Sequence, residues 1–166
     1  MSSKIGLAIA MTSVLLSIVA LSESPTKEAN MLHATGTFDV KINPQSADNS
    51  DAKAANIGRN SWEKQFKGAL VGFSHGEMLY TGDPATSGAY VALEKVTGSL
   101  QGRSGSFVFL HSAVMNRGTP QDWVVRVVPD SGTDELQGLQ GTLTIVIEGG
   151  SHSYDFAYSL EKADGG

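Results

Sequence analysis

Apolar and polar residues alternate along most of the chain between residues 31 and 162, and this alternation predicts β-strands. Residues 32–42 show it best, with small or apolar side chains at even positions and polar ones at odd positions. A period of two residues is typical of a strand with one buried face and one wet face. We count eight such strands and find no segment that would serve as a helical crossover between parallel ones. The strands are therefore predicted to be antiparallel.

Two architectures hide the apolar faces of such strands: an up-and-down barrel and a sandwich. A barrel leaves no exposed strand edges, so we expect an all-β fold with an antiparallel eight-stranded up-and-down β-barrel over residues 31–162. Small residues on the predicted inner face suit a barrel that tapers or leaves space for a guest. These residues are Gly36, Gly68, Gly72, Ala92, Gly98, Gly105 and Gly141.

The longest predicted hairpin covers residues 88–115, and it carries the chemistry of greatest interest. A turn centred on Gly102 and Arg103 sets Glu94 opposite His111, on the apolar side of the sheet. A carboxylate buried without a partner would be costly, and the imidazole is the partner that this register predicts.

Three other connections are predicted. Residues 74–77 should form a turn that leads into residues 78–81, and Gly149-Gly150 should form a two-residue turn that sets Ile145 opposite Tyr154. Residues 43–61 are polar and predict an exposed loop, either a lid or a mobile insertion. Residues 130–137 are expected to hold one helical turn that starts at Ser131 or Thr133.

The first 22 residues have the layout of a signal peptide. A short basic start is followed by 17 uncharged residues, and Ala20-Leu21-Ser22 offers small residues for cleavage before Glu23. Residues 23–30 then form a polar linker. We expect export to a periplasm or the exterior, with no membrane span in the mature form; the alternative is an uncleaved N-terminal apolar anchor.

Composition limits the possible partners and reactions. The net charge of −5 makes nucleic acid an improbable partner, because binding it requires a basic face. The chain has no cysteine, so it offers no disulfide, thiolate nucleophile or sulfur ligand. No histidine spacing indicates a metal site, and no glycine-rich segment indicates a phosphate loop, so we expect no metal and no cofactor.

The segments YVALEKVTGSLQGRSGSFVFLH, WVVRVVPDSGTDELQGLQGTL and SHSYDFAYSL resemble a bacterial family known as domain of unknown function 3224. The likeness covers about residues 31–162. Members of that family are similar in fold to allene oxide cyclase, a small calycin-like barrel that steers cyclisation of an unsaturated fatty-acid epoxide in an apolar cavity. The resemblance implies the barrel but no activity, since no cyclase motif matches here. Residues 1–22 depart from the usual pattern of the family.

Six residues are the candidates for a ligand-binding interior: Glu94, His111, Tyr90, Phe109, Trp123 and Tyr154. The acid and imidazole could be a structural pair, the polar handles of a ligand site or a general acid and base. The first reading is thus an exported barrel that holds a small apolar molecule. The alternatives are an isomerase or cyclase acting on a lipophilic substrate, and a filled barrel whose outer surface binds another protein or a second copy.

Overall fold

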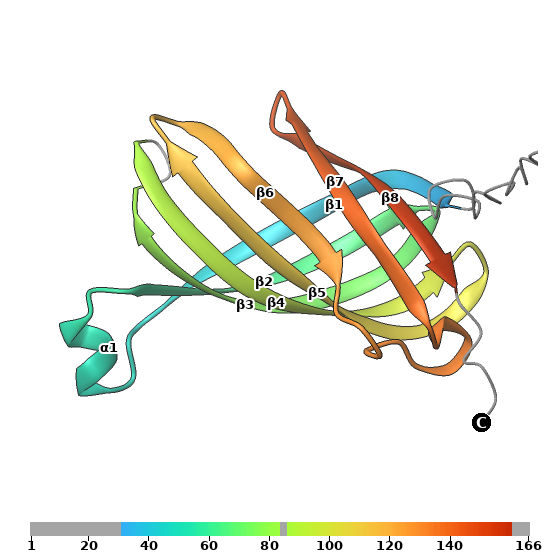
Figure 1. The fold of residues 1–166 in the computed structure, drawn as a ribbon, viewed down its shortest axis with the longest axis horizontal. Helices are drawn as coiled ribbons and strands as arrows, with labels where there is room; N and C mark the ends of the chain where they lie inside the picture. The colour runs from blue at the N-terminus through green and yellow to red at the C-terminus, as the bar shows by residue number, and fades with distance from the viewer. Residues whose placement is uncertain (1–30, 84–85, 161–166) are drawn as a thin grey trace, which may run out of the picture.

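A computed structural model describes residues 31–83 and 86–160, which form the predicted closed barrel of eight antiparallel strands (Figure 1). Each strand pairs with the next in the chain, and β8 pairs back with β1. The strands are β1 (Leu32–Gln45), β2 (Gly58–Gly68), β3 (Leu70–Gly82), β4 (Ser87–Leu100), β5 (Arg103–Asn116), β6 (Thr119–Val127), β7 (Leu139–Glu148) and β8 (Ser151–Leu160). The predicted signal peptide and linker lie outside the described residues.

One end of the barrel is closed by packed side chains. The β2–β3 and β4–β5 turns lie there, together with the short 3-10 helix η2 (Asp134–Leu136), which falls inside the predicted helical turn. Leu136 is fully buried, and a side chain at Gly105 would lie only 3.2 Å from its Cγ atom. Aromatic rings fill the interior next to this end, and Phe109 lies 4.9 Å from Phe107 and 5.3 Å from Phe156 between ring centroids.

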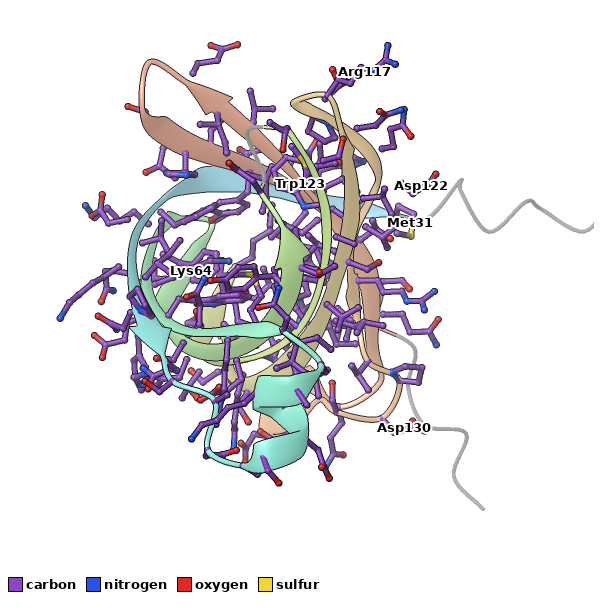
Figure 2. All side chains as sticks on the ribbon, turned by 90° about the vertical axis from the view of Figure 1, so that its left-hand side faces the viewer. Met31, Lys64, Arg117, Asp122, Trp123 and Asp130 are labelled. Atoms are coloured by element: carbon purple, nitrogen blue, oxygen red, sulfur yellow. The ribbon has the colours of Figure 1, made fainter. Side chains whose placement is uncertain are left out.

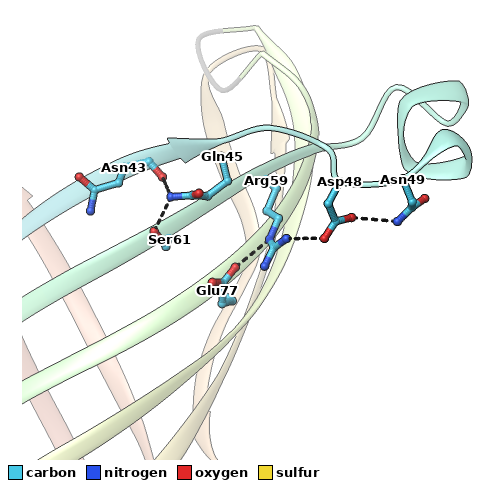
Figure 3. Close-up of polar contacts among 7 residues, drawn as sticks. All are labelled: Asn43, Gln45, Asp48, Asn49, Arg59, Ser61 and Glu77. Carbon is cyan, nitrogen blue, oxygen red and sulfur yellow. Dashed lines mark hydrogen bonds and ion pairs between the residues drawn. The ribbon is translucent and has the colours of Figure 1, made fainter.

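The other end, which we call the mouth, holds the remaining connections. The β1–β2 connection carries the helix α1 (Ser50–Ala54), which lies beyond the ends of the strands (Figure 1). Arg59 links this connection to the sheet, because its guanidinium lies 3.1 Å from Asp48 and 3.0 Å from Glu77 (Figure 3). The predicted loop 43–61 is therefore wrong in its bounds: β1 runs to Gln45, β2 begins at Gly58, and a short helix lies between them.

The first predicted hairpin turn is also wrong. The chain turns at Ala69, directly after Gly68 with its positive φ of 107°, and not at residues 74–77. Ser74 and His75 consequently lie in the middle of β3, with Ser74 buried inside the barrel and His75 exposed outside it. Glycine and small polar residues in this stretch are typical of a turn, whereas Ser74 and Gly76 are small residues on the inner face of the barrel.

The central hairpin is shifted by two residues from the predicted register. Its turn uses Gln101 and Gly102, both with positive φ, so that Glu94 pairs with Phe109 and His111 pairs with Ala92. A shift of two residues keeps every side chain on its predicted face, because the side-chain period is also two. The β7–β8 register was predicted correctly, with Ile145 opposite Tyr154.

The seam between β6 and β7 is the weakest join in the barrel. Only Arg126 and Thr142 are paired across it, whereas β4 and β5 are paired along their whole length. From this point the two strands diverge toward the mouth (Figure 1). The barrel is therefore packed at one end and opens at the other.

Candidate functional site

Four polar side chains are buried together near the middle of the barrel. Lys64 on β2 is 8% exposed, Ser74 on β3 and Glu94 on β4 are fully buried, and His111 on β5 is 3% exposed. We call these four residues the ionic cluster. An end-on view shows Lys64 inside the ring of strands (Figure 2). Each of the four shares the inner face of its strand with apolar core residues, which is why the fold carries them inward.

The carboxylate of Glu94 is the centre of the ionic cluster. Its Oε2 lies 2.8 Å from Nζ of Lys64 and 2.7 Å from Nε2 of His111, and its Oε1 accepts a hydrogen bond from the hydroxyl of Ser74. The contact with His111 is a close approach without hydrogen-bond alignment of the ring N–H. Both oxygens of the carboxylate therefore have partners, and the side chain is fully buried among them.

Aromatic rings surround the ammonium group of Lys64. Its Nζ lies 4.8 Å from the ring centroid of Phe38, 5.3 Å from that of Trp62 and 5.9 Å from that of Phe66. The faces of such rings attract a cation, and the attraction is stronger where water is excluded. Lys64 is thus held by one carboxylate and by aromatic faces.

Burial and charge act in opposite directions on Glu94. Burial by itself raises the pKa of this carboxyl. The contact with His111 and the charge of Lys64 lower the pKa by more than burial raises it, so that it falls to about 2. Burial lowers the pKa of His111, more than the contact with Glu94 raises it, and Lys64 lowers it too. We assign a neutral imidazole to His111, because burial lowers its pKa and Lys64 already supplies the buried positive charge. The ionic cluster then carries no net charge at neutral pH.

Trp62 packs beside the ionic cluster in a space left by a glycine. A Cβ atom at Gly76 would lie 2.2 Å from Cε2 of the indole, so the ring lies directly over this residue. The indole contacts the imidazole of His111 edge to face, at 5.5 Å between centroids. Its buried Nε1 has no hydrogen-bond partner among the described residues, which leaves one polar group of the interior unsatisfied.

The mouth exposes apolar side chains that point inward. Ile42, Trp123 and Ile147 have the strand parity of the core, yet they are 54%, 38% and 55% exposed. An apolar hollow of about 250 Å³ opens at the mouth ends of β3 and β4. Its lining residues are Asn60, Met78, Tyr80, Thr81, Gly88, Ala89, Tyr90 and Met115.

Strand register connects the hollow to the ionic cluster. Met78 in the wall of the hollow pairs with Ala92, and Ala92 pairs with His111. Tyr90 is the next inward-facing residue after Ala92 on β4, toward the mouth. Burial raises the pKa of its phenol, the hydrogen bond from Trp123 lowers this pKa, and the charge of Glu94 raises it. The hollow thus lies on the mouth side of the ionic cluster, with Tyr90 in its lining.

The candidate residues fall into three groups in the structure. Glu94 and His111 meet in the ionic cluster, while Tyr90 and Trp123 lie at the mouth. Phe109 belongs to the packed aromatic core and is 1% exposed. Tyr154 is also buried, and its hydroxyl accepts a hydrogen bond from the backbone N–H of Leu70 at 2.9 Å, so it holds the β2–β3 turn.

Sequence reasoning did not single out Lys64, Ser74 or Trp62. For Lys64 and Trp62 a signal was present, since both share the parity of Phe66 on one strand. Ser74 was hidden by its assignment to a turn. Within residues 31–83 and 86–160, no three His, Cys, Asp or Glu side chains gather in a way that would hold a metal ion. No helix in this part of the chain is long and apolar enough to cross a membrane.

The fold and site define a class of protein: an all-β closed barrel, packed at one end, with a buried ionic cluster and an apolar mouth. The chain belongs to the family described as "Protein of unknown function (DUF3224)", whose model matches residues 34–158. It is similar to the crystal structure of a DUF3224 protein of unknown function from Shewanella oneidensis MR-1. The two are 41% identical, with a TM-score of 0.71, over 80% of this chain and 99% of that one. None of the curated proteins matches the chain.

Proposed function

We propose that the protein binds a small, uncharged and largely apolar molecule in the mouth of the barrel. The observation that carries this proposal is the exposure of Ile42, Trp123 and Ile147 on the inner wall. In the packed half of the barrel the inner face is covered by neighbouring side chains, whereas at the mouth the same face meets water. Concave apolar surface with a few polar groups at its base is typical of small-molecule sites.

The polar handle of the ligand would be Tyr90, whose side chain lines the hollow. The ionic cluster itself has compensated charges, so it offers neither a net positive nor a net negative potential to a charged ligand. The hollow of about 250 Å³ is close to the lower size of small-molecule sites, roughly 300 Å³. We therefore expect a compact ligand, or one that extends from the hollow onto the exposed wall at Trp123 and Ile147.

Binding is better supported than catalysis. A general base must lie within hydrogen-bond reach of the reacting group, whereas Glu94 is fully buried and does not line the hollow. The resemblance to allene oxide cyclase agrees with an apolar guest in a barrel, but among residues 31–83 and 86–160 no carboxylate lines the hollow. The enzyme alternative thus lacks an observation of its own.

A fluorescence titration with N-phenyl-1-naphthylamine, a neutral apolar probe, tests the proposal. Met78 points into the hollow, whereas Val71 on the same strand points outward near the closed end and is 55% exposed. Met78→Trp should fill the hollow and weaken probe binding on the order of tenfold, as expected when about 1.4 kcal/mol of contact is lost. Val71→Trp is the matched control and should bind as the unaltered chain does. Equal affinity for both variants would show that the probe does not enter the hollow.

We further propose that residues 1–22 direct export, so that the barrel meets its ligand in a periplasm or outside the cell. Support comes from the basic start, the uncharged run and the small residues before Glu23. N-terminal sequencing of the protein from its native host should begin near Glu23. An intact Met1 in the membrane fraction would instead indicate the uncleaved anchor.

A further inference from the structure

The outer face of β3, β4, β5 and β6 carries an apolar patch that no described segment covers. Leu79, Val91, Leu93 and Val114 are 50%, 54%, 55% and 46% exposed, although they lie on well-paired strands. The helix α1 lies beyond the end of the strands and does not reach this face (Figure 1). Soluble monomers rarely expose adjoining apolar side chains in this number, and such patches mark interaction sites.

Strand register places Leu79, Val91 and Leu93 in two rows across the four strands, and Val114 lies beside the second row, paired with Ala89. In the first row Glu77 pairs with Leu93, Leu93 with Leu110, and Leu110 with Arg126. In the second row Leu79 pairs with Val91, Val91 with Ser112, and Ser112 with Val124. The first row is thus apolar in the middle, with an acid at its β3 end and a base at its β6 end.

We propose that this face is the interface of a symmetric homodimer. A two-fold axis parallel to the strands and between β4 and β5 places β3 of one copy over β6 of the other. Leu93 then packs on Leu110 of the second copy, and Glu77 meets its Arg126 at both ends of the row. A two-fold interface must be self-complementary in this way.

The same arrangement avoids contacts between like charges. Lys95, next to the first row on β4, pairs with Val108 within its own sheet, so the two-fold axis sets it against Val108 of the second copy. Curvature fits as well, because two convex barrels touch along β4 and β5 and separate toward β3 and β6. The long side chains of Glu77 and Arg126 lie where the gap widens, and they are able to bridge it.

Glu77 already forms an ion pair with Arg59 at 3.0 Å within the chain. This contact holds the carboxylate at the flank of the patch and still leaves its other oxygen for a second guanidinium. Within one chain, Glu77 and Arg126 lie three strand spacings apart, roughly 14 Å at about 4.8 Å each, so they cannot pair with each other. If a charge change at Glu77 alters the effect of a charge change at Arg126 on dimerisation, the two side chains therefore meet between two copies.

Sedimentation velocity of the full chain over a concentration series tests the interface. Leu93→Glu buries two charges at the centre of the dimer and should abolish dimerisation. Val146→Glu is the matched control, since Val146 is 44% exposed on β7, away from the patch. We expect this variant to dimerise as the unaltered chain does. A monomer at every concentration for the unaltered chain, or a dimer that survives Leu93→Glu, would overturn the proposal.

Charge reversal tests the symmetry itself. The single variants Glu77→Arg and Arg126→Glu each set like charges against each other at both ends of the row, and each should dimerise at least about tenfold more weakly. An equal mixture of the two restores opposite charges at both ends, so the mixture should dimerise more tightly than either variant alone. A mixture that behaves as the average of its components would rule out the proposed axis.

Discussion

Lys64 on β2 and Glu94 on β4 form a buried ion pair across the intervening strand β3, with Nζ and Oε2 2.8 Å apart. They meet because β3 presents only small residues between them: Ser74 pairs with Lys64, and Gly76 pairs with Glu94. Ser74 adds a hydrogen bond, while Gly76 leaves room for Trp62. A single strand with two small inner residues thus makes the ionic cluster possible.

Removing the charge of Glu94 should be costly. Glu94→Gln leaves the ammonium of Lys64 buried without a counter-charge, and breaking such a pair costs about 3–5 kcal/mol of the free energy of unfolding. Urea unfolding at neutral pH measures the loss. The double variant Lys64→Met/Glu94→Gln should lose less than Glu94→Gln alone, because no uncompensated charge remains. Additive losses would mean that the two side chains do not interact.

The pH dependence of stability should follow the ionic cluster. The pKa of Glu94 is about 2 in the folded chain against an ordinary 4.5, so its contribution is present above pH 4.5 and is lost as pH falls toward 2. Those values correspond to about 3 kcal/mol. The pKa of His111 is also lowered on folding, so stability should begin to fall below pH 6.5 as the unfolded imidazole gains its proton first.

Urea midpoints measured from pH 7 down to acid would show both steps. Glu94→Gln should lose less stability than the unaltered chain as pH falls below 4.5. His111→Gln should lose less stability as pH falls below about 6.5. Parallel curves for the unaltered chain and both variants would show that other groups control the acid response.

A methyl group at Gly76 should displace Trp62. Gly76→Ala places a Cβ atom 2.2 Å from Cε2 of the indole, so the ring or the strand must move. We expect a loss of about 1–3 kcal/mol in the free energy of unfolding and a shift in tryptophan fluorescence. Trp62→Leu removes the obstructing ring. In a chain that carries Trp62→Leu, adding Gly76→Ala should therefore lower the free energy of unfolding very little. A full additional cost in that double variant would place the clash elsewhere.

Tyr154 and Trp123 should separate stability from binding. Tyr154→Phe removes the hydroxyl that accepts from the N–H of Leu70, which should cost about 1–3 kcal/mol and leave probe affinity unchanged. Trp123→Ala removes a ring at the rim of the mouth that is 38% exposed, so stability should change by about 1 kcal/mol or less while probe affinity falls. Thermal unfolding and titration with N-phenyl-1-naphthylamine, run on both variants, provide the comparison. The reverse result would place the ligand near Tyr154.

The family resemblance and the alternation pattern led to the same architecture by separate routes. The match to the DUF3224 family confirms the resemblance, and the closed barrel confirms the architecture. The pairing of acid and imidazole was also found, although the register that predicted it was wrong by two residues. It survived because an even shift preserves the inner face, and long side chains reach a diagonal neighbour as well as an opposite one.

Within the strands that it predicted, the sequence by itself determined which residues face inward, because the two-residue period of a strand is a local property that survives errors in register. It therefore placed Glu94, His111 and the aromatic residues of the core correctly with respect to the sheet. Only the tertiary structure decided which inward residues meet, since Lys64 and Glu94 lie on strands that are not neighbours and touch only when the sheet curves into a barrel. The barrel is packed with side chains at one end, whereas β6 and β7 are joined by a single residue pair. This difference separates the packed core from the exposed inner wall of the mouth.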